Sequence, residues 1–135
     1  MIVVKERLAN FPNINYHNAG LSNENSILRF SIGGSQSRAS DDGEEVVNVS
    51  RLDDMECGPV TFMKIDIEGG EKAAIEGAAE TIRNFRPKLA IAVYHEASDI
   101  WAIPKMVLSI DHRYKLYLRH YTESVYETIM FFVPS

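Results

Sequence analysis

The chain has 135 residues, of which 45% are hydrophobic, and this is typical of one soluble domain spanning residues 1–135. It carries 14 Lys and Arg against 19 Asp and Glu, and the net charge of −5 argues against nucleic-acid binding through a general basic surface. No apolar run approaches the roughly 20 residues that a membrane-spanning helix needs. The first residues lack the apolar core of a signal peptide, and the lone Cys57 can form no intrachain disulfide, so we expect a cytoplasmic protein without a membrane partner.

The first third of the chain predicts short strands and loops. Apolar residues at helical spacing indicate the end of a helix over residues 1–10. Strands are expected at 14–21 and 26–32, and the turn-forming residues between them predict that the two strands form a hairpin. Residues 33–45 are mostly Gly, Ser and acidic residues and predict an exposed, mobile loop, and an edge strand is expected at 45–52.

The remainder alternates regularly between strands and helices. Apolar, β-prone runs predict four strands, at residues 60–67, 88–94, 114–121 and 126–133. Apolar residues at every third or fourth position predict one helix over residues 70–85. Ser98 suits the N-cap of a short helical stretch, Pro104 suits the first position of a further helix to about Ile110, and Trp101 is expected in the core. The order β-α-β-α-β-β predicts an α/β fold with a parallel sheet finished by one antiparallel strand.

Ionisable side chains follow each of the three expected parallel strands. In an open α/β sheet, ligands bind at the carboxyl ends of the strands, so we expect these side chains to face one crevice. The residues are Asp66, Glu68 and Glu71 after the first strand, Tyr94 and His95 after the second, and Arg119 and His120 at the end of the third.

Asp66 is the leading candidate among them. Its carboxylate lies near the end of an apolar strand, where burial without a partner is costly, so it would bind a cofactor, a metal or a substrate hydroxyl, or else pair with Lys64 or cap the next helix. His95 could serve as a general base or a metal ligand, or bond to the turn that follows it. Glu68 and Glu71 are favoured near a helix N-terminus by the helix dipole alone.

Other groupings are less specific. Arg119 and His120 could bind an anionic group, or the next hairpin could hide them. Asp66, Glu68 and His95 offer the oxygen and nitrogen ligands of a metal site, although their spacing is not diagnostic. Neither a GxGxxG motif nor a P-loop occurs in the chain.

The run from Val60 to Glu71, with its Lys-Ile-Asp-Ile-Glu-Gly-Gly-Glu stretch, resembles the FkbM family of S-adenosylmethionine-dependent methyltransferases. The helix that follows, the Tyr94-His95 strand end and the strands near the carboxyl terminus are also similar, so the resemblance covers about residues 14–133. It implies a Rossmann-like class I methyltransferase sheet whose last strand is antiparallel. It also implies S-adenosylmethionine as cofactor and methyl transfer, usually to oxygen, on a sugar or small-molecule acceptor.

The resemblance also implies roles for individual residues. Ala19, Gly20 and Leu21 would lie near the adenine of the cofactor, and Asp66 near its methionine part and the acceptor. Asp66 or His95 would take the proton of the acceptor. With these roles, the predicted catalytic residues are Asp66, His95 and Glu68, and those predicted to bind the acceptor are Glu71, Tyr94, Arg119 and His120.

The chain departs from the family pattern near its start. The glycine-rich loop after the first strand and the acidic residue that ends the second are absent, which predicts a domain truncated at its N-terminus with weak affinity for the cofactor. Strand 14–21 would then pair with strand 60–67 or stay loose. Exposed sheet edges would invite self-association. Two alternative functions are therefore a non-catalytic relative that completes its sheet with another chain, and a metal-dependent hydrolase that uses Asp66, Glu68 and His95.

Overall fold

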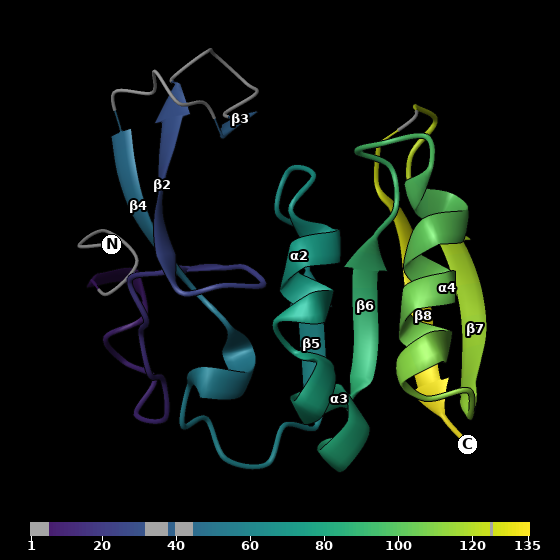
Figure 1. Ribbon diagram of the computed structural model, residues 1–135, viewed down its shortest axis with the longest axis horizontal. Helices are drawn as coiled ribbons and strands as arrows, with labels where there is room; N and C mark the ends of the chain where they lie inside the picture. Colours follow the sequence, from purple (N-terminus) through teal and green to yellow (C-terminus); the bar gives the residue numbers. More distant parts are fainter. Residues whose placement is uncertain (1–5, 32–37, 40–44, 125) are drawn as a thin grey trace.

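The computed structural model describes residues 6–31, 38–39, 45–124 and 126–135 and shows an α/β fold with two mixed sheets side by side (Figure 1). The first sheet has the order β1-β4-β2-β3, formed by Gly20–Leu21, Glu45–Ser50, Ser26–Ser31 and Arg38–Ala39. The second sheet has the order β5-β6-β8-β7, formed by Phe62–Ile65, Lys88–Ala92, Thr128–Pro134 and Tyr114–His120. None of the described helices is long and apolar enough to cross a membrane.

The first sheet differs from the prediction in its pairing. The expected strand 14–21 is reduced to β1, which runs parallel to β4, while β2 pairs antiparallel with β4. The predicted hairpin between 14–21 and 26–32 is therefore wrong, and β4 is an interior strand and not an edge. Backbone bonds explain the choice, because the Ser22 N–H donates to the Ser50 carbonyl at 3.0 Å and extends the pairing of β1 with β4.

Two expectations for this part of the chain lie largely outside the described residues. Of the predicted loop 33–45, the structure describes only β3 and the first residue of β4. Of the helix expected over residues 1–10, residues 1–5 are outside the description, and residues 6 and 7 are helical.

The second sheet follows the predicted order of elements. The parallel pair β5 and β6 is in register from Phe62 opposite Lys88 to Ile65 opposite Ile91. The last strand, β8, is antiparallel to both β6 and β7, as expected. The expected strand 14–21 does not pair with β5, because its remnant β1 belongs to the other sheet. Within the described ranges, β5 hydrogen-bonds only to β6, so its outer edge is open.

The single helix predicted over residues 70–85 is two helices, α2 (Glu71–Glu76) and α3 (Ala79–Phe85). The break falls where the loop after β1 meets the helix, because a Cβ added to Gly77 would lie 1.8 Å from the carbonyl oxygen of Ser22. The short helix η1 (Leu52–Asp54) supplies the cap of α3: the Asp53 carboxylate accepts the N–H groups of Glu80 and Thr81 at 3.0 and 2.8 Å. Tertiary contacts thus divide a continuous helical pattern.

The next helical segment is longer than expected. Instead of two short helices there is one, α4 (Asp99–Ile110), with Pro104 inside it. A proline inside a helix removes one backbone donor, and the remaining hydrogen bonds continue the helix past it. Trp101 is not in the core but is 59% exposed.

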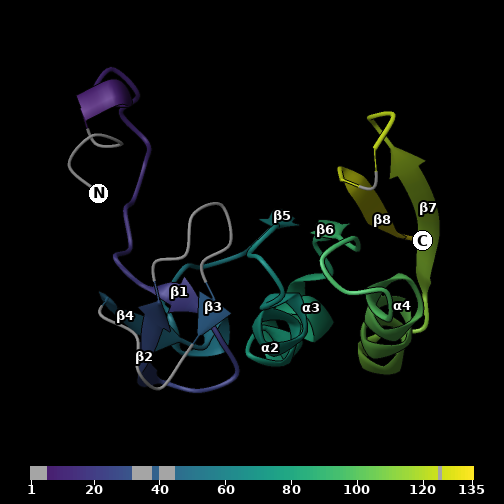
Figure 2. The same cartoon turned by 90° about the horizontal axis from the view of Figure 1, so that it is seen from above.

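The main core lies between the second sheet and its helices, all of which cover one face of that sheet (Figure 2). Inward-facing side chains of β5, β6 and β8 pack there against the apolar stripes of the three helices. Residues that are almost fully buried include Ile65, Ile75, Ile82, Leu89, Ile91, Ile103, Val107 and Phe132. This core fixes the neighbouring ends of β5 and β6, from which the candidate site is built.

Candidate active site

Three predicted site residues meet at the carboxyl ends of β5 and β6. Asp66 directly follows β5, Glu71 begins α2, and His95 lies just beyond β6. Nδ1 of His95 is 2.8 Å from Oε1 of Glu71, and its Nε2 is 3.8 Å from Oδ1 of Asp66. Nε2 also lies 3.7 Å from Oε2 of Glu68. Because β5 and β6 are adjacent and parallel, their ends bring together residues that are about 30 positions apart in the sequence.

The turn between β5 and α2 places Glu71. Its two central residues, Glu68 and Gly69, have φ angles of 51° and 93°, and the Gly70 N–H donates to the Ile67 carbonyl at 3.1 Å. Positive φ is easy for glycine but costs energy at a glutamate, so Glu68 is a strained position. The tight turn lets the Ile67 N–H donate to Oε1 of Glu71 at 2.9 Å, which holds this carboxylate inside the protein with 1% of its side chain exposed.

His95 and Glu71 carry unsatisfied polar atoms. The His95 side chain is only 9% exposed, and in the described part of the chain neither ring nitrogen has a hydrogen-bond partner. Oε2 of Glu71 is also buried without a partner. The 2.8 Å contact between the two residues is at ion-pair distance, but its atoms are not aligned as a hydrogen bond. Buried polar atoms are usually satisfied, so these orphans mark the site as functionally unusual.

Tyr94 completes the inner side of the cluster. Its hydroxyl donates to Oδ1 of Asp66 at 3.1 Å, and its ring lies 4.2 Å from the His95 ring, centroid to centroid. Burial, followed by the hydrogen bond to Asp66, raises the pKa of Tyr94 to about 12. Tyr94 therefore stays protonated near neutral pH and acts as a donor to Asp66.

Asp66 also has the structural partner that its sequence position suggested. Nζ of Lys64 lies 3.1 Å from Oδ2 of Asp66, but the Lys64 side chain is 62% exposed, and an exposed pair of this kind contributes little stability. The lysine uses only Oδ2, while Oδ1 faces Tyr94 and His95. Asp66 is therefore both ion-paired and part of the cluster.

Arg119 and His120 lie apart from this cluster. Both are exposed; Arg119 donates to the neighbouring Leu118 carbonyl, and Nδ1 of His120 is 2.8 Å from Oγ1 of Thr128. Among the interactions of residues 45–124 and 126–135, none joins either of them to Asp66 or His95. The reason is topological, because β8 separates β7 from β6 and neighbouring strands are about 4.8 Å apart.

Ala19, Gly20 and Leu21, the residues expected near the adenine, lie in or beside β1 of the other sheet. Gly20 pairs with Val49, and Leu21 packs against the main core. Over the described ranges, no hydrogen bond or ion pair links these three residues with Asp66. Among the described residues, the two parts of the cofactor site expected from the sequence, residues 19–21 and Asp66, are therefore not brought into direct contact.

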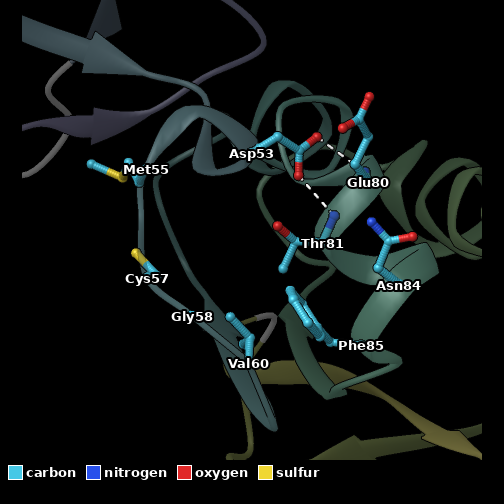
Figure 3. Close-up of a pocket in the computed structure, with 9 residues that line it drawn as sticks. All are labelled: Asp53, Met55, Cys57, Gly58, Val60, Glu80, Thr81, Asn84 and Phe85. Carbon is cyan, nitrogen blue, oxygen red and sulfur yellow. Dashed lines mark hydrogen bonds between the residues drawn. The ribbon is translucent and has the colours of Figure 1, made fainter.

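A separate hollow of about 210 Å³ lies at the opposite end of β5 (Figure 3). The bonds from Glu80 and Thr81 to Asp53 cross its upper wall, and Phe85 and Val60 close it below. Cys57 is exposed at its rim and has no basic neighbour in the sequence. The hollow lies beside the α3 cap, away from the ends of β5 and β6.

Sequence and structure comparisons agree on the family. Residues 6–125 match the model of the methyltransferase FkbM domain. The solved structure of a methyltransferase FkbM from Methylobacillus flagellatus KT is similar to this chain, with a TM-score of 0.80 and 28% sequence identity over 97% of this chain and 32% of that one. The chain thus spans about a third of the length of that protein. No curated protein matches the chain. The match over most of its length shows that the chain belongs to the FkbM methyltransferase domain family.

Proposed function

We propose that the chain carries the acceptor side of an S-adenosylmethionine-dependent O-methyltransferase that acts on a sugar or another small molecule. The observation that carries this proposal is the cluster of His95 with the carboxylates of Asp66 and Glu71 at the ends of β5 and β6. In the proposal, the second sheet is one part of a Rossmann-like class I methyltransferase sheet. The lone, exposed Cys57 fits a reducing cytoplasm.

The cluster suits the chemistry of a hydroxyl acceptor. Methylation of a hydroxyl oxygen requires its proton to leave, and a carboxylate or imidazole within hydrogen-bond reach provides a place for it. Oδ1 of Asp66 and Nε2 of His95 face one another, and an acceptor hydroxyl between them would give its proton to this pair. Glu71 positions the His95 ring from its other side, and Tyr94 orients Asp66 by its hydrogen bond.

The cofactor assignment follows the family, whose members generally use S-adenosylmethionine. We keep Ala19, Gly20 and Leu21 as proposed neighbours of the adenine and Asp66 as the proposed neighbour of the methionine part. Because these residues lie in two different sheets, we expect the 135-residue chain alone to bind the cofactor weakly. Arg119 and His120 remain proposed contacts for an anionic part of a large acceptor. The open edge of β5 is where a further strand, from this or another chain, would add.

The proposal is tested by incubating the purified chain with millimolar, methyl-labelled S-adenosylmethionine and a panel of sugars and small hydroxy compounds. We expect label in at least one hydroxyl acceptor, and a rate roughly 100-fold lower for Asp66→Asn because the proton acceptor is lost. Asp54→Asn is the matched control, since Asp54 is an exposed carboxylate in η1, and its rate should be unchanged.

Two outcomes would count against the proposal. Absence of label in every acceptor with a folded wild-type chain would favour the non-catalytic alternative. An Asp66→Asn variant as fast as wild type would move the acceptor site away from this cluster.

A further inference from the structure

We propose that Asp66, Glu71 and His95 together bind one divalent metal ion. Each contributes one ligand atom, and the three atoms lie within 4.8 Å of one another. From the sequence, Glu68 is expected to be the third ligand. The Glu68 side chain is 62% exposed, however, and the carboxylate that lies close to Asp66 and His95 inside the protein is that of Glu71. This set of ligands shares Asp66 and His95 with the metal site expected for a hydrolase and has Glu71 in place of Glu68.

The separation between His95 and Glu71 is that of two atoms that share an ion. Ligand atoms about 2.1 Å from one ion are about 3 Å apart when adjacent and about 4.2 Å apart when opposite. A histidine gives one ring nitrogen to an ion, and with one nitrogen of His95 the three ligand atoms lie within 4.8 Å of one another. Nδ1 of His95 is 2.8 Å from Oε1 of Glu71, and Nε2, on the other side of the ring, is 3.8 Å from Oδ1 of Asp66. The limit of 4.8 Å for the group means that contraction by roughly half an ångström is enough to close the site.

The orphaned buried atoms provide a second, independent indication. Both ring nitrogens of His95 and Oε2 of Glu71 lack hydrogen bonds among the described residues, although the two side chains are only 9% and 1% exposed. Oε1 of Glu71 lies close to Nδ1 but off the direction of its N–H. An ion bound by the imidazole would take a carboxylate oxygen of Glu71 as a further ligand. A bound ion would satisfy the imidazole lone pair and the buried carboxylate at once.

The charges and the ligand atom types indicate which metal ions the site would bind. The carboxylates of Asp66 and Glu71, with Glu68 beside them, outnumber the one Lys or Arg that pairs with them among the described residues, the mostly exposed Lys64. Two carboxylates and one imidazole favour Mn²⁺, Fe²⁺ or Zn²⁺ over Ca²⁺, which prefers oxygen ligands alone. The site is therefore one for a divalent transition-metal ion.

The role of the ion, but not its binding, rests on the proposed function. An ion held here would bind the acceptor hydroxyl and lower its pKa, as metal ions do for bound water. Asp66 and His95 would then act as ligands of the ion, and this replaces their direct role as proton acceptor in the metal-free site. The hydroxyl proton would pass to Glu68, the remaining carboxylate of the cluster, which is 3.7 Å from Nε2 of His95, and the oxidation state of the metal would not change.

The test is calorimetric titration of the chelator-treated chain with Mn²⁺, and separately with Zn²⁺, in the absence of cofactor and acceptor. We expect one ion per chain and affinity lower by at least about tenfold in Glu71→Gln and in His95→Gln. His112→Gln is the matched control, because His112 is an exposed histidine in the turn after α4, and its affinity should equal that of wild type.

Because loss of the buried Glu71 could disturb folding, Asp66→Asn is titrated as well and each variant is checked by circular dichroism. A folded wild-type chain that binds neither ion overturns the proposal, and so does binding that is equal in all the variants. The titration involves no methyl transfer, so an inactive chain that still binds Mn²⁺ through these residues would contradict only the proposed function.

Discussion

Replacing Gly77 with alanine is expected to lower the free energy of unfolding by at least about 3 kcal/mol. The added Cβ would lie 1.8 Å from the carbonyl oxygen of Ser22 and 2.9 Å from its carbonyl carbon, and both are backbone atoms that cannot rotate away. The φ of Gly77 is −72°, which any residue adopts, so the glycine is required for space and not for backbone freedom. The first sheet would have to move away from α2 and α3, and the bond from the Asp53 N–H to the Gly77 carbonyl would be lost.

Urea denaturation of wild type, Gly77→Ala and Gly70→Ala measures this effect. Gly70 is the control because its φ is −87° and the three atoms nearest to an added Cβ, all of Ile67, would lie at 3.3–3.4 Å, so we expect a change within about 1 kcal/mol. Equal stability of the two variants would show that the loop after β1 does not press on the helix break.

Truncation of Tyr114 to alanine is expected to destabilise the protein by about 3–5 kcal/mol, the range for a large aromatic residue in a core. Tyr114 is 5% exposed at the start of β7, packs edge-on against Phe132, and donates its hydroxyl to the Pro87 carbonyl at 2.8 Å. Tyr114→Phe keeps the packing and leaves that carbonyl without its donor, so we expect it to cost about 1–2 kcal/mol. Tyr117→Phe, on the same strand and 45% exposed, should have almost no effect.

Tyr114 also predicts a pH dependence. Burial, assisted by the charge of Asp111, raises the pKa of Tyr114 to about 12, whereas an unfolded tyrosine titrates near 10. Between about pH 10 and 12 the folded state binds the proton more tightly, so this stabilisation is complete below pH 10 and is lost as the pH rises toward 12. Urea denaturation at a series of alkaline pH values should show a shallower loss of stability in Tyr114→Phe than in wild type. If wild type and Tyr114→Phe lost stability with pH at the same rate, the pKa of the Tyr114 hydroxyl would be the same in the folded and unfolded states.

The sequence predicts the fold best where a helix has a long amphipathic pattern or where a strand is apolar on both faces. The order of β5, the helices, β6, α4, β7 and β8 follows from apolar runs and amphipathic spacing, and the convergence of Asp66 with His95 follows from adjacent parallel strands. The pairing of β1 with β4 does not follow from the sequence, because β1 has only two residues, too few to define a partner. The helix break at Gly77 is set by the Ser22 carbonyl, 55 positions earlier, and no local signal announces it.

Within the site, sequence reasoning underestimated Glu71. A glutamate at the start of a helix is explained by the helix dipole alone, which gave no reason to expect it to be buried beside His95. The available signal was the Gly-Gly pair before it, since a turn with positive φ can fold the glutamate back onto the Ile67 N–H. The expected place of Arg119 and His120 in the cluster is wrong because β8 lies between β6 and β7, and apolar runs do not specify which strands become neighbours.

The proposed function requires that Glu71 and His95 act as one unit at the ends of β5 and β6. A double-mutant cycle measures this directly, from urea denaturation of wild type, Glu71→Gln, His95→Gln and the double variant, all in the presence of a chelator. With the two side chains 2.8 Å apart and buried, we expect a coupling free energy of at least about 1 kcal/mol. Additive effects, within about 0.4 kcal/mol, would show that the two residues do not interact and would contradict the cluster on which the proposed function rests.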